Sequence, residues 1–128
     1  MIEICMPDEE KEYLISCLDE SNFYLEYGSG GSTLEGLKKV KKGMITVESD
    51  KAFLEKVLSE TPPNPKPKFL PMVPDLGPIG DWGYPTSAEK SAHFYTYSVF
   101  PWITAQRNNF EIDTVLVDGR WRVACVIT

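Results

Sequence analysis

Four short apolar runs alternate with segments of helical periodicity, and this order constrains the fold more than any other feature. Between the runs, apolar residues recur at three- and four-residue spacing, which is the pattern of one helix face. Alternation of helices and strands is typical of a three-layer α/β fold with a mostly parallel sheet. We therefore predict one Rossmann-like domain over residues 1–128, with strands at 23–27, 44–47, 69–73 and 114–117.

Pro7, followed by three acids, predicts the start of a first helix that ends before Ser21. Its core face is expected to consist of Tyr13, Leu14, Cys17 and Leu18. A second helix is predicted from Leu34 to about Lys41, with Ser32 or Thr33 as its cap.

A third helix is expected to begin at a cap formed by Ser49 or Asp50, with an apolar stripe of Phe53, Leu54, Val57 and Leu58. Pro71 removes a backbone donor from the third strand, which predicts a position at a sheet edge or a bulge. The loop at 74–86 is long enough to favour a functional role. The last helix is expected to begin at Ser87 or Ser91 and to end before Asn108.

Composition limits the partners of the chain. A formal charge of −6 argues against a nucleic-acid binder, and the lysines at 38, 39, 41 and 42 are expected to form a solvated face. Cys5, Cys17 and Cys125 form no C-x-x-C pair, so we predict neither a disulfide framework nor a metal site. The sequence shows no secretory leader pattern and no apolar stretch near the roughly 20 residues that span a bilayer. We therefore expect a soluble, cytoplasmic domain.

The strongest chemical signal is the turn Gly28-Ser29-Gly30-Gly31 between the first strand and a helix. Glycines allow a ligand close to the backbone, and the helix that follows presents a positive dipole end. The spacing is not G-x-G-x-x-G, and the Lys-Ser/Thr of a P-loop is absent, so a pyrophosphate or triphosphate is less favoured than a smaller adenosyl ligand.

Glu48 follows the second strand, at the edge where an acid can accept both hydroxyls of a ribose. Together with the glycine turn, it indicates a site for an adenosyl-type ligand. The alternative is a connecting turn with Glu48 as a solvated acid.

The run 23–33, with an acid before Gly-x-Gly, resembles the first motif of class I S-adenosylmethionine-dependent methyltransferases, and 45–50 resembles their second. L-E-Y-G-S-G-G-S-T, V-E-S-D, D-W-G-Y-P and V-D-G-R-W-R together resemble a small group of methyltransferase-like proteins. The resemblance implies an S-adenosylmethionine cofactor and a substrate that the sequence does not identify.

The resemblance also implies roles for individual residues. Glu26 would lie near the methionine amino group, Glu48 would hold the ribose, and Asp75-Leu76-Gly77 would lie near the adenine. Asp118 would face the methyl group, and its place at the end of a strand makes it the preferred proton acceptor, ahead of Asp81 and His93. The Asp118-Gly119 pair is equally well explained as a turn. The full set of expected cofactor residues is Glu26, Gly28, Ser29, Gly30, Gly31, Ser32, Glu48, Ser49, Asp75, Leu76 and Gly77.

Substrate contacts are expected from Asp81, Trp82 and Arg120, although packing or surface pairing would explain each of them. The aromatic residues Tyr95, Tyr97, Phe100 and Trp102 could line a substrate wall, but their spacing better suits a core face.

The family fold implies seven strands, and the sequence ends just after the fourth. We expect either a fragment or an assembly, such as a homo-oligomer, that covers the exposed edge of the fourth strand. The competing functions are a catalytically inactive binding or interaction module of the same fold and a nucleotide-dependent oxidoreductase.

Overall fold

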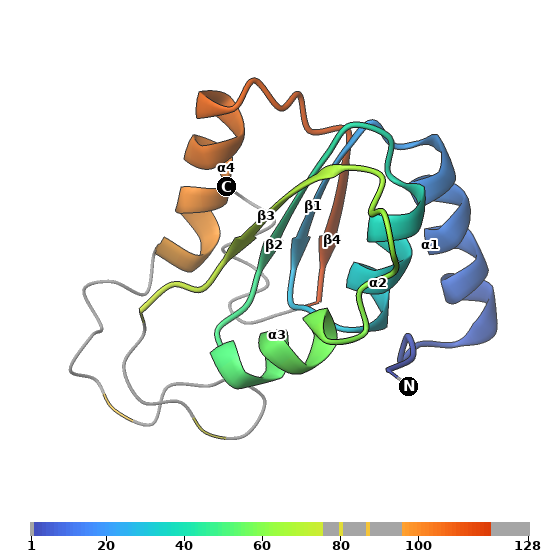
Figure 1. Ribbon diagram of the computed structural model, residues 1–128, viewed down its shortest axis with the longest axis horizontal. Coiled ribbons are helices and arrows are strands. Elements are labelled where there is room, and N and C mark those ends of the chain that lie inside the picture. The colour runs from blue at the N-terminus through green and yellow to red at the C-terminus, as the bar shows by residue number, and fades with distance from the viewer. Residues whose placement is uncertain (1, 76–79, 81–86, 88–95, 119–128) are drawn as a thin grey trace.

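The computed structural model describes residues 2–75, 80, 87 and 96–118. Within them, the strands pair in parallel in the order β3-β2-β1-β4. Helices α1 and α2 cover one face of this sheet and α4 covers the other (Figure 1). The predicted α/β fold is confirmed, with elements α1 (Asp8–Glu20), β1 (Phe23–Tyr27), α2 (Gly31–Lys39), β2 (Gly43–Val47), α3 (Lys51–Leu58), β3 (Lys68–Met72), α4 (Thr96–Arg107) and β4 (Thr114–Val117).

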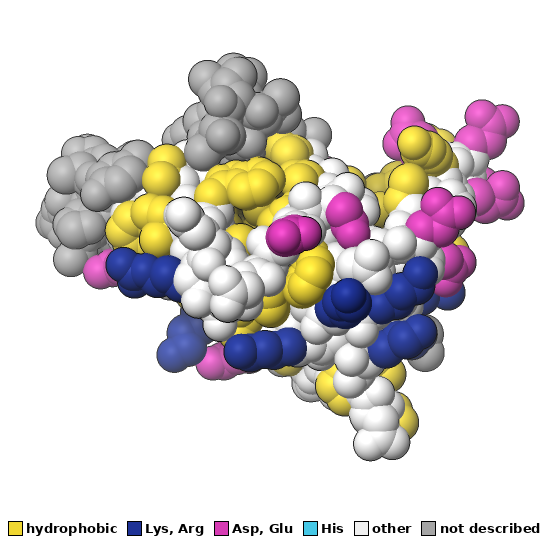
Figure 2. Space-filling model, turned by 90° about the horizontal axis from the view of Figure 1, so that it is seen from above, with side chains coloured by type: hydrophobic (Ala, Val, Ile, Leu, Met, Phe, Trp, Pro, Cys, Tyr) yellow, Lys and Arg dark blue, Asp and Glu magenta, His cyan; other side chains and the backbone are white. Residues whose placement is uncertain are grey.

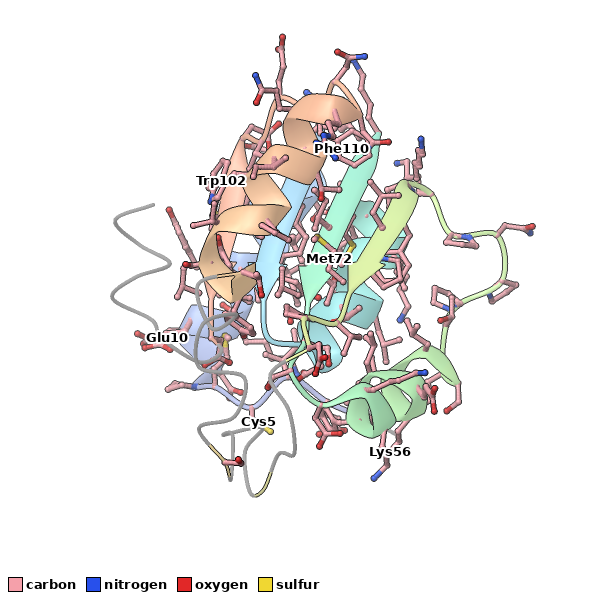
Figure 3. The ribbon with its side chains drawn as sticks, turned by 90° about the vertical axis from the view of Figure 1, so that its left-hand side faces the viewer. Cys5, Glu10, Lys56, Met72, Trp102 and Phe110 are labelled. Carbon is pink, nitrogen blue, oxygen red and sulfur yellow. The ribbon has the colours of Figure 1, made fainter. Side chains whose placement is uncertain are left out.

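The two central strands, β1 and β2, are buried on both faces, which is why both are mainly apolar in the sequence. Their polar exceptions, Glu26 and Thr46, hydrogen-bond to each other. Tyr24 and Met44 point to the face of α1 and α2. Leu25 and Ile45 point to the opposite face, under α4. Phe110 belongs to the α4 side of the core and lies near the end of the sheet where the strands begin (Figure 3). The sheet is thus a rigid base for residues that follow the strands.

Helix α1 differs in detail from its prediction. Pro7 is the N-cap residue rather than part of the first turn, and Tyr13 is 65% exposed, so its assignment to the core is wrong. The buried residues of α1 are Leu14 and Leu18, four positions apart, while Cys17 is half-buried. Successive residues of an α-helix are rotated by about 100° around its axis. The Tyr13 side chain, one residue before Leu14, therefore points away from the buried face that Leu14 and Leu18 form.

Helix α2 begins at Gly31 with Gly30 as its N-cap residue, earlier than the predicted start at Leu34. Neither Ser32 nor Thr33 is the N-cap residue: both lie in the first turn, where their hydroxyls donate to the buried Glu26 carboxylate, and Thr33 Oγ1 accepts from Gly30 N–H. The helix ends at Lys39.

Helix α3 has Asp50 as its N-cap residue, whose carboxylate accepts a hydrogen bond of 3.1 Å from Phe53 N–H. Asp50 rather than Ser49 is therefore the cap. Leu54 and Val57 are buried as predicted, whereas Phe53 is exposed and Leu58 is half-buried.

The outer strands lie at the two ends of this sheet. β3, with Pro71, is at one edge, as predicted. β4 is at the other edge of the described sheet, and its Val115 is 42% exposed. An oligomer that covers β4 stays a prediction.

Helix α4 ends at Arg107, before Asn108 as predicted. Of its two expected starts, Ser87 is not helical and Ser91 lies outside the described residues. Of its aromatic residues, Tyr97 is buried, Trp102 is half-buried and Phe100 is exposed. The core-face interpretation therefore holds for Tyr97 and fails for Phe100.

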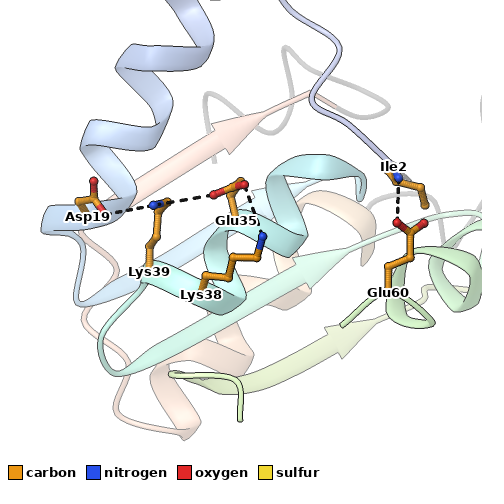
Figure 4. Close-up of polar contacts among 6 residues, drawn as sticks. All are labelled: Ile2, Asp19, Glu35, Lys38, Lys39 and Glu60. Carbon is orange, nitrogen blue, oxygen red and sulfur yellow. Dashed lines mark hydrogen bonds and ion pairs between the residues drawn. The ribbon is translucent and has the colours of Figure 1, made fainter. Parts of the chain in front are cut away.

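Charged side chains lie around the outside of these layers. Acids gather on the side of α1, as Figure 2 shows. Lys39 lies 3.5 Å from Asp19 and 3.9 Å from Glu35, and Lys38 lies 3.8 Å from Glu35 (Figure 4). Salt bridges between side chains as exposed as these each contribute at most about 1 kcal/mol to the stability of the fold. In the part of the chain that the structure describes, no helix is long and apolar enough to cross a membrane.

Candidate ligand pocket

A pocket of about 690 Å³ lies at the carboxyl ends of β1, β2 and β4. Its walls come from the glycine turn at 28–31 with Ser32, from residues 48–50 with Phe53, and from residues 2–6, which we call the N-terminal segment. Tyr97 and Asp118 complete the lining. Ligands of open α/β sheets bind at this edge, because the turns that follow parallel strands converge there.

The glycine turn starts with a residue that needs glycine. Gly28 has φ = 97°, a conformation that side chains disfavour. Its N–H donates to Val47 O at 2.7 Å, which extends the pairing of β1 and β2 to the edge of the pocket. The chain then enters α2 at Gly31, so the positive end of that helix lies at the pocket.

Glu48 is held in place by neighbours on two sides. Its Oε1 accepts from Ser29 N–H at 3.0 Å and from the Ser29 hydroxyl at 2.6 Å, and its Oε2 accepts from Asp50 N–H at 3.0 Å. A carboxylate offers about four acceptor positions, so about one is left for a ligand hydroxyl. A second ligand hydroxyl could be accepted if the Ser29 hydroxyl, which can rotate, turned away.

Glu26 lies beneath the pocket, is fully buried, and is not among the residues that line it. Four hydroxyl groups donate to its carboxylate: Oε1 accepts from Tyr24 at 3.0 Å and from Ser32 at 2.8 Å, and Oε2 accepts from Thr33 and, at 2.7 Å, from Thr46. Both oxygens are therefore saturated. A direct contact with a ligand amino group would require one of these hydroxyls to release its hydrogen bond.

The environment of Glu26 changes its acidity. Burial raises the pKa of Glu26 from 4.5 to about 7, and the hydrogen bonds from Thr33, Thr46, Ser32 and Tyr24 act against that rise. Because Ser32 and Thr33 belong to the first turn of α2 and Thr46 belongs to β2, these hydrogen bonds tie α2 and β2 to β1 through Glu26. Thr33 Oγ1 also accepts from Gly30 N–H at 3.1 Å.

The other predicted site residues divide into three groups. Asp118 lines the pocket, where its N–H donates to Tyr27 O at 3.0 Å, and Ser32 and Ser49 line it as buried residues. Asp75 is exposed and is not part of the described lining. Leu76, Gly77, Asp81, Trp82, His93, Tyr95 and Arg120 lie outside the described residues.

Sequence reasoning missed the N-terminal segment, and it assigned Asp50 and Phe53 only to the capping and core of α3. A weak signal was present, since Ile2, Ile4 and Met6 alternate with polar residues or cysteine in the way of an extended segment packed on one side.

The charged residues of the described lining are all acidic, namely Glu3, Glu48, Asp50 and Asp118. Such a pocket repels phosphate groups and attracts a cation. No group of three or more metal-ligating side chains occurs among the residues that the structure describes.

The sequence matches no known protein-family model and no curated protein. It does match a solved structure, that of a methyltransferase-like protein from Silicibacter pomeroyi, with 37% identity and a TM-score of 0.85. The match covers 98% of this chain and 66% of the other, so the chain spans just under two thirds of the length of that protein. The identity and the coverage of nearly all of this chain show that it has a methyltransferase-like fold.

Proposed function

We propose that the chain binds S-adenosylmethionine in the pocket at the carboxyl ends of β1, β2 and β4 and serves in methyl transfer to a substrate that is still unidentified. The observation that carries the proposal is the pairing of the glycine turn with Glu48. Both features line the same pocket, and the distance between Ser29 N and Glu48 Oε1 is 3.0 Å.

The described residues fit this cofactor in size and charge. A volume of about 690 Å³ lies within the range of pockets for small ligands and cofactors. Four carboxylates in the lining suit a ligand with a sulfonium and an ammonium group. The acidic lining repels a pyrophosphate, and the glycine turn lacks the G-x-G-x-x-G spacing, which together disfavour a nicotinamide dinucleotide.

The ribose and the methionine carboxylate of the cofactor would each have a partner in this arrangement. Glu48 has acceptor capacity for a ribose hydroxyl, and the start of α2 presents positive dipole charge suited to the methionine carboxylate. When bound, the cofactor supplies an electrophilic methyl group. The protein would contribute orientation of the two reactants and, at Asp118, a carboxylate able to accept a proton from the attacking group.

Calorimetric titration with S-adenosylhomocysteine tests the proposal. We expect wild-type protein to bind with micromolar affinity and Glu48→Ala to bind about 10- to 100-fold more weakly, because a charged hydrogen-bond acceptor is lost. Glu55→Ala, in the exposed surface of α3, is the matched control and should bind like the wild type. Absence of binding by folded wild-type protein would refute the proposal, and equal binding by Glu48→Ala would refute the role of Glu48.

A further inference from the structure

The N-terminal segment supplies five of the residues that line the pocket, and nothing in the motifs of the chain assigns it a role. Its half-buried residues, Ile2, Ile4 and Met6, alternate with the exposed Glu3 and Cys5. This alternation is that of an extended chain with one side packed against the domain.

Two observations show that the segment has a defined place. Ile4 and Met6 pack against the core between α1, α2 and the sheet. At the other end, Ile2 N–H donates to Glu60 Oε1 at 2.9 Å (Figure 4). The segment is thus attached at both ends, to the core next to α1 and to the chain just after α3.

Between these attachments, the segment crosses the start of α2 at very short range. A Cβ at Gly31 would lie 2.4 Å from the backbone carbon of Glu3 and 2.4 Å from the backbone nitrogen of Ile4. Gly31 is therefore needed for close approach, since only a residue without a side chain lets the segment lie there. Cys5 lies at the carboxyl-end side of the sheet, opposite the end marked by Phe110 (Figure 3).

From this geometry we infer that the N-terminal segment is a ligand-contacting wall of the pocket, positioned by Glu60 and by the absence of a side chain at Gly31. The inference rests on the proposed function. Because Ile4 and Met6 pack on the core, the segment offers a ligand its backbone and the exposed Glu3 and Cys5, while Glu48 forms a hydrogen-bonding side of the pocket.

Cys5 provides a direct probe of this wall. The test uses a variant of the full chain that carries Cys17→Ser and Cys125→Ser, so that Cys5 is the remaining thiol. The rate of maleimide labelling is measured with and without S-adenosylhomocysteine, at a concentration set by calorimetry on the same variant. At about ten times the Kd, about one tenth of the protein is ligand-free, and labelling should slow about tenfold.

A second measurement tests how the wall is positioned. Glu60→Ala removes the acceptor of Ile2 N–H and should weaken S-adenosylhomocysteine binding about 3- to 10-fold. Glu55→Ala, in the same helix region but without a hydrogen bond to the segment, should leave the affinity unchanged. Unchanged labelling of Cys5 at saturating ligand, or unchanged affinity in Glu60→Ala, would overturn the inference while leaving the proposed function intact. Absence of calorimetric binding by the wild type would overturn both.

Discussion

Glu26→Gln should alter how the stability of the protein depends on pH. In the folded protein the pKa of Glu26 is raised by burial from 4.5 to about 7, despite four hydroxyl donors. The folded state therefore holds this proton more tightly than the unfolded state does. The contribution of Glu26 to the free energy of unfolding is therefore greatest below pH 4.5 and falls as the pH rises from 4.5 to about 7. Above that pH the contribution is constant.

The size of the effect follows from the same values. At about 1.4 kcal/mol for each tenfold change in proton affinity, a rise from 4.5 to about 7 corresponds to about 3 kcal/mol. Glutamine has a similar shape to the neutral acid and does not titrate. The variant should therefore lose this contribution to pH dependence, although its amide cannot accept from four hydroxyls at once.

Urea unfolding of the wild type and Glu26→Gln at several values between pH 4 and pH 8 measures this directly. The difference in free energy of unfolding, wild type minus variant, should fall by about 3 kcal/mol between pH 4.5 and pH 7. Other titrating groups cancel in that difference, and Glu55→Gln provides the comparison for an exposed acid. A difference that stays constant across this range would refute the account of Glu26 as a buried acid of raised pKa.

Three further variants test local features. Asp50→Ala removes the side-chain acceptor of Phe53 N–H and should lower the free energy of unfolding by about 1 kcal/mol in chemical denaturation. Gly31→Ala forces a Cβ against the N-terminal segment and should cost about 1–3 kcal/mol in the same assay, because the segment must be displaced. Burial raises the pKa of Asp113, but hydrogen bonds led by that from the Ser21 hydroxyl outweigh it and lower the pKa below 3.8. Asp113→Asn should therefore destabilise the protein at neutral pH, and the deficit should shrink as the pH falls below 3.8; a deficit that is independent of pH in acid titration would contradict this.

The sheet could be predicted because its strands are short, apolar and separated by helical segments. β1 and β2 are buried on both faces, so their mainly apolar sequences could be identified as strands without deciding which side chains face the core. The edge position of β3 followed from Pro71, which cannot donate to a neighbour. Glu48 was found because the end of a parallel strand fixes where its next residue lies.

Other features depend on contacts between parts of the chain that are distant in sequence. The start of α2 was misplaced because Ser32 and Thr33, good capping residues in isolation, donate to Glu26 instead. The N-terminal segment was missed as part of the pocket because the five residues before Pro7 do not indicate which residues they contact in the fold. Its partners, Gly31 and Glu60, follow it by more than 20 residues in the sequence.

The location of the ligand site is the central claim, and amide chemical-shift mapping by NMR during titration with S-adenosylhomocysteine tests it most directly. We expect shifts to concentrate at residues 2–6, 28–32 and 48–50, which surround the pocket of about 690 Å³. A second cavity, of about 360 Å³, lies between Trp102 and Ile112 at the far end of α4 and serves as the internal comparison. Shifts centred on that cavity, or no shifts at ligand concentrations in the millimolar range, would contradict a ligand site at the carboxyl ends of the strands.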